Sequence, residues 1–405
     1  MNNSSIYPCG NNSEVCTGCG ACSAACPNGA ITMAPDLEGF LYPIIDPTKC
    51  SDCGRCRQVC PVISPSQGLL AENKPDVFAA WHLDHTVRLA SSSGGIFSAF
   101  SEHILGLGGV VAGAAFDEHL LVRHVIVGRV EDLARLRGSK YVQSQIETAL
   151  YRDIQGILRN GRPVLFSGTP CQVAALRRLV GTQDQLFCVD LVCHGVPSPR
   201  FWQTHLRQLS SKVGHTVTDS AFRDKTYGWK QYCLRFVFSN GGQVLRRFWE
   251  DSYMLAFLKN YSLRPSCYRC RFANLDRQGD LTLGDFWGVK NRYPQYDSDD
   301  LGTSIVLVNN PKGKQLLQAC PPRIFLGPAD LDAALAGNPM LARPASRPPQ
   351  RDTFYKDLMS LSLTEVYRKY KLRPESLVRR LAAKCCGKIK RLGARCERII
   401  SQVMS

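Results

Sequence analysis

Two runs of cysteines near the N-terminus restrict the fold of this chain more than any other feature of its sequence. Residues 16–27 read Cys-Thr-Gly-Cys-Gly-Ala-Cys-Ser-Ala-Ala-Cys-Pro, and residues 50–61 read Cys-Ser-Asp-Cys-Gly-Arg-Cys-Arg-Gln-Val-Cys-Pro. Both runs share the spacing C-x2-C-x2-C-x3-C-P, so one module is written twice. Spacers this short wrap three thiolates around one cube of iron and sulfide, and the intervening glycines let backbone N–H donors approach the sulfurs.

This spacing is the pattern of bacterial ferredoxins with two 4Fe-4S clusters, in which the fourth cysteine of each run ligates the cluster of the other run. We therefore predict two sites that carry electrons one at a time. The first ferredoxin site consists of Cys16, Cys19, Cys22 and Cys60, and the second ferredoxin site of Cys50, Cys53, Cys56 and Cys26. The alternative is a zinc scaffold. Structural zinc sites usually combine C-x2-C pairs across a longer loop, which eight cysteines in register do not resemble.

Four further cysteines, Cys171, Cys193, Cys267 and Cys270, are scattered over the later chain. Only the last two form a chelating pair by spacing. Cys171 follows Thr169 and a proline, which suit the N-cap and first position of a helix, so the helix dipole would favour its thiolate. Cys193 follows a predicted strand that would end at the same sheet edge. From the spacing alone, the four either meet and hold a third cluster, here called the domain site, or are buried structural thiols.

From residue 77 onward, strands and helices alternate, which favours an α/β domain with a mixed sheet. Strands are predicted at 77–81, 110–116, 122–127, 164–167, 186–192, 281–283 and 304–308. Helices are predicted at 94–107, 145–158, 172–180 and 199–209, with an appended hairpin formed by 232–238 and 244–249. We therefore predict four segments: an α+β ferredoxin-like 2x(4Fe-4S) module at 1–63, a linker at 64–76, the α/β domain at 77–345, and a basic helical tail at 346–405.

Two loops before predicted helices suit a nucleotide-like cofactor. Residues 91–95, Ser-Ser-Ser-Gly-Gly, lead into a helix whose free N–H groups can hold phosphate at the positive end of its dipole. Gly168 and Thr169 likewise follow a strand and open a helix, at the position where α/β sheets bind ligands. A plain serine N-cap explains the first loop equally well. Neither loop is a GxGxxG fingerprint, so no Rossmann NAD site is predicted.

The net charge of +16 is concentrated at the C-terminal end. Residues 366–405 hold twelve lysines and arginines against two acids, which is +10 of the total, so the remaining chain gives no reason to predict nucleic-acid binding. Apolar residues interleaved with bases over 377–403 are typical of an amphipathic helix on an anionic membrane surface, although a solvated helix packed on the body or on a partner explains them as well. Without a secretion signal or a membrane-spanning segment, we expect a cytoplasmic protein, peripheral at the inner membrane face in the first interpretation.

Several motifs occur in an order that is similar to one known family. They are Gly-Ser-Lys-Tyr-Val-Gln-Ser at 138–144, Gly-Thr-Pro-Cys-Gln at 168–172, Cys-His-Gly-Val-Pro-Ser at 193–198, Arg-Asp-Lys at 223–225 with Gly228 and Trp229, Cys-Tyr-Arg-Cys at 267–270, Gly279 with Asp280, and Leu-Gly-Asp-Phe-Trp-Gly at 283–288, together with the loop at 91–95. From about residue 16 to 308 the chain resembles the beta subunits of coenzyme F-420 hydrogenases and dehydrogenases, in the form with an N-terminal double ferredoxin module.

The resemblance implies a flavoprotein, because members of this family place FAD beside an iron-sulfur cluster in the α/β domain. It also implies that the domain site holds a third 4Fe-4S cluster. The implied FAD contacts are loop residues near the phosphates, at Ser92, Ser93, Gly94, Gly95, Gly168 and Thr169, and residues near the flavin ring, at Lys140, Gln143 and Ser144.

Two residues are candidates for catalysis. His194 could donate a proton, because imidazole titrates near neutral pH. Asp285 could orient flavin or substrate. A histidine held by backbone hydrogen bonds and an aspartate that caps a turn explain these two residues equally well.

We therefore hypothesise an oxidoreductase whose clusters pass single electrons to or from FAD, which exchanges a hydride with a substrate. The family name does not fix that substrate. Bacterial relatives of this arrangement resemble proteins of surface-polysaccharide gene neighbourhoods, which implies a small molecule such as a glycan precursor; a deazaflavin such as coenzyme F-420 is the alternative. A second hypothesis is a relay protein that exchanges electrons with a partner protein and has no substrate chemistry of its own.

Overall fold

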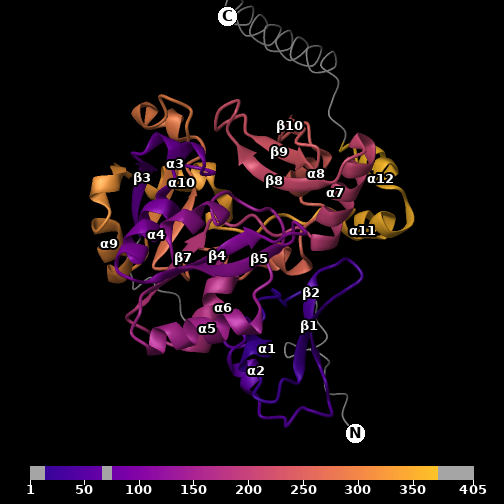
Figure 1. Cartoon of the computed structure of the whole chain (residues 1–405), viewed down its shortest axis with the longest axis horizontal. Helices are drawn as coiled ribbons and strands as arrows, with labels where there is room; N and C mark the ends of the chain where they lie inside the picture. The colour runs from indigo at the N-terminus through magenta and orange to yellow at the C-terminus, as the bar shows by residue number, and fades with distance from the viewer. Residues whose placement is uncertain (1–13, 66–74, 373–405) are drawn as a thin grey trace, which may run out of the picture.

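The computed structural model describes residues 14–65 and 75–372 (Figure 1). The ferredoxin module consists of α1 (Ala21–Ala25), β1 (Ile31–Pro35), β2 (Leu41–Ile45) and α2 (Arg55–Gln58). β1 and β2 form an antiparallel hairpin, and α1 packs against α2. Each helix begins after a left-handed glycine, Gly20 with φ 78° and Gly54 with φ 70°. The two halves of the repeat therefore share one backbone conformation.

A mixed sheet of eight strands forms the centre of the α/β domain. Its strands are β3 (Asp76–His82), β4 (Val110–Phe116), β5 (Val122–Val127), β6 (Val164–Gly168), β7 (Leu186–Leu191), β11 (Leu281–Asp285), β12 (Ser304–Val308) and β13 (Ile324–Ala329). They are ordered β13-β3-β12-β11-β7-β6-β4-β5. β4, β6, β7 and β11 run parallel to one another, and the remaining pairs are antiparallel. The prediction of a mixed sheet is confirmed.

Helices cover both faces of this sheet. They are α3 (His85–Leu89), α4 (Ile96–Gly106), α5 (Thr148–Arg159), α6 (Pro170–Val180), α9 (Pro311–Gln318) and α10 (Leu331–Gly337), joined by the 3-10 helices η1 (Val130–Arg135), η2 (Pro265–Arg269), η3 (Val289–Asn291), η4 (Pro294–Tyr296), η5 (Pro321–Arg323) and η6 (Pro339–Leu341). Leu165 of β6 packs with α4, whereas its neighbour Phe166 packs with α5 and α6. Because successive strand residues point to opposite faces, α4 lies on one face and α5 and α6 on the other.

A second sheet of three strands lies beside the large one (Figure 1). β9 (Cys233–Phe238) and β10 (Gln243–Arg247) are the predicted hairpin, and β8 (Val217–Asp224) adds the third strand. α7 (Pro199–Val213), α8 (Ser252–Leu258), α11 (Arg351–Ser360) and α12 (Leu363–Lys369) cover it. Trp202, Phe236 and Tyr253 lie in one core together with Phe40 and Tyr42 of the ferredoxin module. The module therefore shares apolar core with the rest of the chain.

The predicted tail divides at residue 372. Phe354 of α11, Val366 of α12 and Leu372 are fully buried in the core of the second sheet, so residues 346–372 belong to the folded body. Residues 373–405, which hold the amphipathic segment 377–403, lie outside the described residues. Among the helices of the described part, none is long and apolar enough to cross a membrane.

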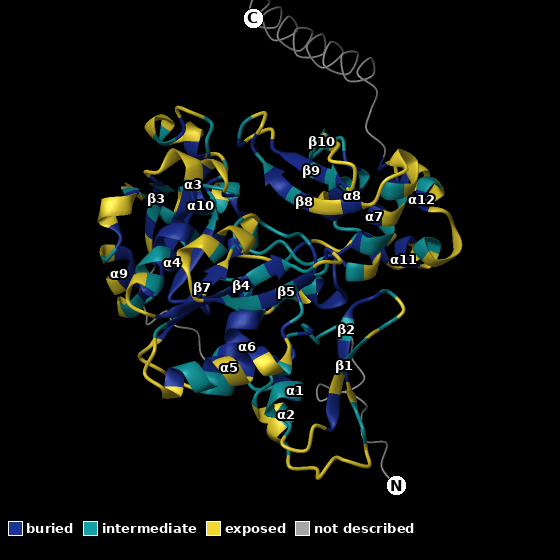
Figure 2. Ribbon diagram, in the orientation of Figure 1, coloured by how far each residue is buried: buried dark blue, intermediate teal, exposed yellow. Residues whose placement is uncertain are grey.

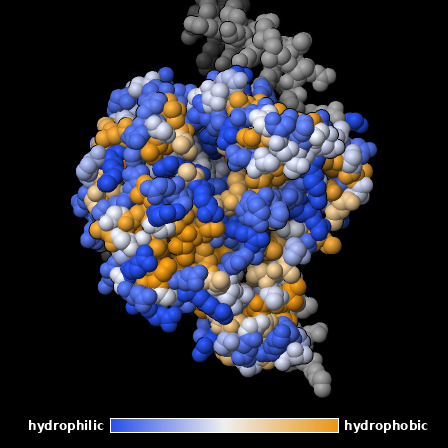
Figure 3. Space-filling view, in the orientation of Figure 1, coloured by the Kyte–Doolittle hydropathy of each residue, from blue (hydrophilic) through white to orange (hydrophobic). Residues whose placement is uncertain are grey.

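Burial differs between the centre of the molecule and the tip of the ferredoxin module. Strands of the large sheet are buried, whereas residues 47–53 at the tip are exposed (Figure 2). The face in Figure 3 is mostly polar, with an apolar area near its middle, over the strands of the large sheet. The eight ferredoxin cysteines therefore lie in environments of very different depth.

Candidate iron-sulfur sites

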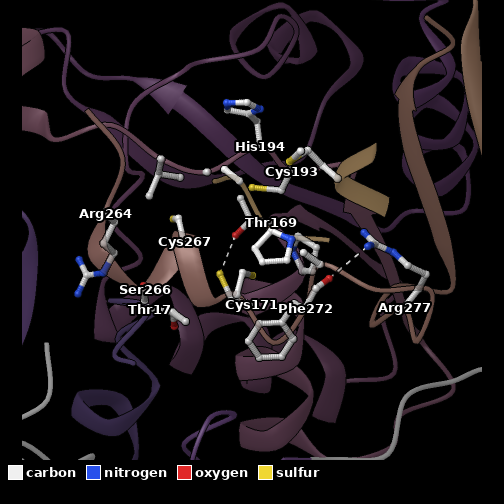
Figure 4. Close-up of a pocket in the computed structure, with 18 residues that line it drawn as sticks. Thr17, Thr169, Cys171, Cys193, His194, Arg264, Ser266, Cys267, Phe272 and Arg277 are labelled. Atoms are coloured by element: carbon white, nitrogen blue, oxygen red, sulfur yellow. Dashed lines mark hydrogen bonds between the residues drawn. The ribbon is translucent and has the colours of Figure 1, made fainter. Parts of the chain in front are cut away.

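The four cysteines of the domain site line one cavity with an empty volume of about 560 Å³, which includes its open mouth (Figure 4). Cys171 lies in the first turn of α6, after β6, and Cys193 lies beyond β7. Since β6 and β7 are parallel neighbours, their carboxyl ends meet at one edge of the sheet. η2 carries Cys267, and Cys270 ends that helix. The structure thus brings together the four residues that the sequence predicts as ligands.

The depth of these cysteines bears on what they can hold. Burial raises the pKa of Cys171 and Cys267 to about 12, and it also raises the pKa of Cys193 well above the ordinary value of a thiol. The neighbouring cysteines of the site add to each increase. Thiolates this deep in a protein need positive partners, because an unpaired buried charge is costly. The iron ions of a cluster would provide that charge.

The spacing of the side chains distinguishes a cluster from a zinc ion. In residues 14–65 and 75–372, no three histidine, cysteine or acidic side chains converge closely enough to bind a single metal ion. Zinc would draw its sulfur ligands to about 2.3 Å from the metal, whereas the ligands of a cube surround a larger group. The cavity and the donor set therefore fit a 4Fe-4S cluster better than the alternative zinc scaffold.

The first ferredoxin site is a second cavity, lined by all four of its predicted ligands, Cys16, Cys19, Cys22 and Cys60. Cys60 reaches the first run because it follows α2, which packs against α1. Burial is the main reason that the pKa of Cys19 rises to about 12, and the nearby Cys60 and Cys16 contribute less to the same shift. The geometry is the one that cross-ligation between the two runs requires.

The second ferredoxin site lies at the tip of the module. Cys50 and Cys53 are exposed and Cys56 is half-buried. Partial burial raises the pKa of Cys56, and the proximity of Cys50 and Cys53 raises it further, so these three cysteines lie together. Cys26 ends α1, and its sulfur accepts a hydrogen bond of 3.2 Å from the backbone N–H of Ala30. Ligation by Cys26 stays a prediction.

The first ferredoxin site adjoins the domain site. Thr17 lines both cavities. A small apolar cluster of Val62, Ala174 and Phe272 packs against cysteines of both sites, namely Cys60, Cys171 and Cys270. No signal in the sequence pairs these segments, because Thr17 and Phe272 lie far apart in the chain. The contact is the chief feature that sequence reasoning missed.

The predicted phosphate loop is bonded to other parts of the chain. The Ser92 hydroxyl accepts hydrogen bonds from the backbone N–H of Ser139 at 2.6 Å and from its hydroxyl at 3.0 Å. Ser93 donates to the carbonyl of Thr303 at 2.9 Å. A Cβ at Gly94 would lie 2.3 Å from the carbonyl oxygen of Ala80, so the loop packs tightly on β3. Gly95 caps α4 with φ 87°.

The other implied FAD contacts also hold the fold together. The ammonium of Lys140 donates to four carbonyls around the end of η1, although burial lowers its pKa to about 7. Ser144 bonds His124 at 2.7 Å, and the amide oxygen of Gln143 accepts from the N–H of Leu41 in the ferredoxin module. Gly168 ends β6, and Thr169 lines the domain site, with its hydroxyl 3.1 Å from the Cys171 sulfur.

These contacts bear on whether FAD fits the nine residues. The described side chains among them form no open cradle for a pyrophosphate, because their hydroxyl and ammonium groups are bonded within the chain. The FAD contacts stay a prediction.

The two candidate catalytic residues lie in bonded positions. His194 lines the domain site, its Nε2 is 2.6 Å from the Asn260 side-chain oxygen, and burial lowers its pKa, which favours neutral imidazole. Asp285 accepts two hydrogen bonds from Arg223, at 2.7 and 2.8 Å, and one from Trp229 at 2.6 Å. These contacts stabilise the local structure, and they assign a catalytic role to neither residue.

Two family models match the chain. Residues 161–330 match the model that describes the C terminus of the coenzyme F-420 hydrogenase/dehydrogenase beta subunit, and residues 15–63 match a 4Fe-4S dicluster domain. The first match contains all four cysteines of the domain site, and the second contains all eight ferredoxin cysteines. The loops at 91–95 and 138–144 lie outside both matches.

Curated relatives agree with this division. The F subunit of the F(420)H(2) dehydrogenase of Methanosarcina mazei is 28% identical over 196 residues, which are 44% of this chain and 53% of that protein. The coenzyme F-420-dependent sulfite reductase of Methanocaldococcus jannaschii is 27% identical over 169 residues, 41% of this chain and 25% of that protein. A ferredoxin-like protein in the nif region of Sinorhizobium fredii is 43% identical over 53 residues, 12% of this chain and 75% of that protein. The chain thus spans about half of the first relative and a quarter of the second.

Proposed function

Because this chain belongs to the family of coenzyme F-420 hydrogenase and dehydrogenase beta subunits, in the form with a double ferredoxin module, we propose that it relays single electrons between that module and the domain site. Each 4Fe-4S cluster accepts and releases one electron at a time. The observation that carries the proposal is the shared wall of two cysteine cavities, since Thr17 lines both. Electron transfer along a relay requires neighbouring clusters to lie close together, and the shared wall supports that proximity.

The cysteines of the sites differ in burial, and this difference supports an order in which electrons pass from one site to the next. Cys50 and Cys53 are exposed at the tip, whereas Cys22 of the first ferredoxin site is buried. An electron-donor or electron-acceptor protein can approach the tip without entering the molecule. The apolar side chains of Val62 and Phe272 pack against cysteines of both inner sites. Electrons would therefore exchange with a partner at the second ferredoxin site and reach the domain site through the first.

Anaerobic purification with iron and sulfide analysis tests the number of stations. Three 4Fe-4S clusters predict about twelve irons per chain, and two predict about eight. Cys267→Ser should remove roughly four irons and leave the ferredoxin signals in electron paramagnetic resonance (EPR) spectra of the reduced protein. The matched control is Cys320→Ser, because Cys320 is buried in a different core and lines neither cavity. About eight irons in the unchanged protein would remove the domain cluster from the proposal.

The finer proposal is that FAD in the same domain converts single electrons into a hydride for a substrate, the chemistry that a flavin supplies when bound. It rests on the family resemblance, and the internally bonded Lys140 and Ser93 give it no support. The substrate class that we propose is a small molecule such as a glycan precursor in surface-polysaccharide metabolism, with a deazaflavin as the alternative. Flavin analysis of the same anaerobic sample tests it: one FAD per chain supports the proposal, and a chain with full iron and no flavin contradicts it.

A second candidate function is relay to a partner protein without substrate chemistry. The bonded state of the two candidate catalytic residues favours it, because Asp285 accepts from Arg223 and Trp229 while His194 pairs with Asn260. Its test is anaerobic turnover of the isolated chain with reduced deazaflavin or with glycan precursors. Rapid oxidation of a reduced redox protein, with no turnover of either small molecule, would support the relay.

A further inference from the structure

Arg264 is a buried cation between the first ferredoxin site and the domain site. Its side chain is 0% exposed. Nε donates to the carbonyl of Cys16 at 2.8 Å, one amino group donates to the carbonyl of Leu41 at 3.0 Å, and the other donates to the side-chain oxygen of Gln143 at 3.3 Å. The guanidinium carbon lies 4.0 Å from the ring centre of Tyr42. All of these partners are neutral.

The other fully buried arginines of the described chain have carboxylate partners. Arg277 pairs with Asp190 at 2.8 Å, and Arg351 pairs with Glu38. For Arg264, no carboxylate lies within ion-pair distance in the part of the chain that the structure describes. Burying a charge without a counter-charge is strongly unfavourable. A negative group that the amino acids do not supply is therefore expected near Arg264.

The two cysteine sites are the candidates for that negative group. Arg264 lines the domain-site cavity, and Figure 4 shows its guanidinium turned away from Cys267. The hydrogen bonds to Cys16 and Leu41 place the same guanidinium against the ferredoxin module. A Cβ at Gly18 would lie 2.9 Å from its nitrogen, so a glycine between two ligands leaves room for it.

We propose that Arg264 is a positioning residue whose positive charge is shared by the clusters of the first ferredoxin site and the domain site, raising the reduction potential of both. The inference rests on the proposed function, because it needs clusters at these cysteines. Adding an electron makes a cluster more negative, and a nearby cation in a dry environment stabilises that reduced form. The residue thereby favours electron arrival at the inner sites from the exposed second site.

Three variants of the full-length, cluster-loaded protein separate this role from a structural one. Arg264→Gln removes the charge, and Arg264→Lys keeps it. Gln143→Glu leaves Arg264 in place and sets a carboxylate at the atom that accepts its hydrogen bond. The control is Arg269→Gln, which removes the last arginine of helix η2, whose side chain is 69% exposed and screened by water.

The measurement is a redox titration followed by EPR, after iron and sulfide analysis of each variant. We expect Arg264→Gln and Gln143→Glu to shift the inner clusters to more negative potentials, while Arg264→Lys and Arg269→Gln stay near the unchanged protein. Normal iron with unchanged potentials in Gln143→Glu overturns the inference, even where Arg264→Gln fails to assemble. A protein without iron at the domain site overturns the proposed function instead, so the two failures are distinguishable.

Discussion

The hydroxyl of Tyr151 donates a hydrogen bond of 2.8 Å to the carbonyl of Cys19, which joins helix α5 of the α/β domain to the ligand loop of the first ferredoxin site. Tyr151 is fully buried, and α1 packs against both α5 and α6. The hydroxyls of Ser23 and Thr148 meet beside this bond at 3.2 Å. The ligand loop is therefore held from outside the module, and its stability depends on α5.

Replacing Tyr151 with phenylalanine tests this dependence. Tyr151→Phe leaves the Cys19 carbonyl without its donor in a buried place, which should cost about 1–3 kcal/mol. We expect a lower unfolding temperature and faster loss of iron to a chelator. The control is Tyr227→Phe, because Tyr227 is 48% exposed and should tolerate the change. Equal iron-release rates in the two variants would contradict the role of the bond.

Two equivalent glycines of the repeat give a matched pair of substitutions. Gly20 and Gly54 both have positive φ, so alanine at either position carries a left-handed strain of about 1–2 kcal/mol. A Cβ at Gly20 would also lie 2.8 Å from the carbonyl oxygen of Ile146, whereas Gly54 has nothing within 4 Å. We expect Gly20→Ala to lower the unfolding temperature much more than Gly54→Ala. Equal effects would mean that the module does not dock tightly on the domain.

Cross-ligation can be tested at the fourth cysteine of the second run. Cys60 lines the cavity of the first ferredoxin site, so Cys60→Ser should damage that cluster and spare the one at Cys50 and Cys53. Cys26→Ser should have the opposite effect. EPR of the reduced variants, with iron analysis, distinguishes a buried cluster from one that exposed chelators attack first. Loss of the exposed cluster in Cys60→Ser would reverse the assignment.

Local sequence patterns predict two neighbouring strands of the large sheet. The expected ranges 110–116 and 122–127 coincide with β4 and β5, and in β4 a continuous apolar run bounded by turns leaves few alternatives. β8 escapes prediction because its pattern includes Arg223 and Asp224, which are used in tertiary ion pairs. β13 contains Pro328, which an edge strand tolerates and a central strand does not.

The candidate sites likewise include features that local sequence patterns predict and features that they do not. Short spacing predicts the two ferredoxin sites, since ligands within one run are near in space whatever the rest of the chain does. The link from Thr17 to Phe272 depends on long-range docking, which spacing does not encode. Lys140 is a further example, because only the fold shows that its ammonium donates hydrogen bonds to four carbonyls of η1 and the following loop. The functional interpretation of the loops rests on resemblance for this reason.

The role of Asp285 can be decided by stability. Arg223 is buried, and both of its amino groups bond the Asp285 carboxylate. Asp285→Asn leaves this arginine without its counter-charge, which should lower the free energy of unfolding by about 3 kcal/mol. The more exposed pair of Asp219 and Arg235 provides the control. Asp219→Asn should change the free energy of unfolding by less than about 1 kcal/mol. Unchanged stability with lost turnover would instead favour a role in orienting substrate.

The environment of His124 predicts that the free energy of unfolding falls in mildly acidic solution. Its ring is buried between a hydroxyl and a carbonyl: Nδ1 is 2.7 Å from the Ser144 oxygen, and Nε2 is 3.1 Å from the Ser167 carbonyl. This pairing suits neutral imidazole with the proton on Nε2. Burial is the main reason that the pKa of His124 falls from 6.5 to about 4, and the charge of Lys140 contributes less to the same shift. The folded state therefore binds fewer protons than the unfolded state between these two values.

The sign of the effect follows from that difference in bound protons. The contribution of neutral His124 to the free energy of unfolding is fully present above pH 6.5. It is lost as the pH falls toward 4, because the unfolded chain gains a proton that the folded chain excludes. Between about pH 7 and pH 5 the loss should be roughly 2 kcal/mol. Urea unfolding of His124→Gln should show less of this dependence, while His119→Gln, which alters an exposed ring, should keep all of it. An identical acid dependence in both variants would assign the loss to other groups.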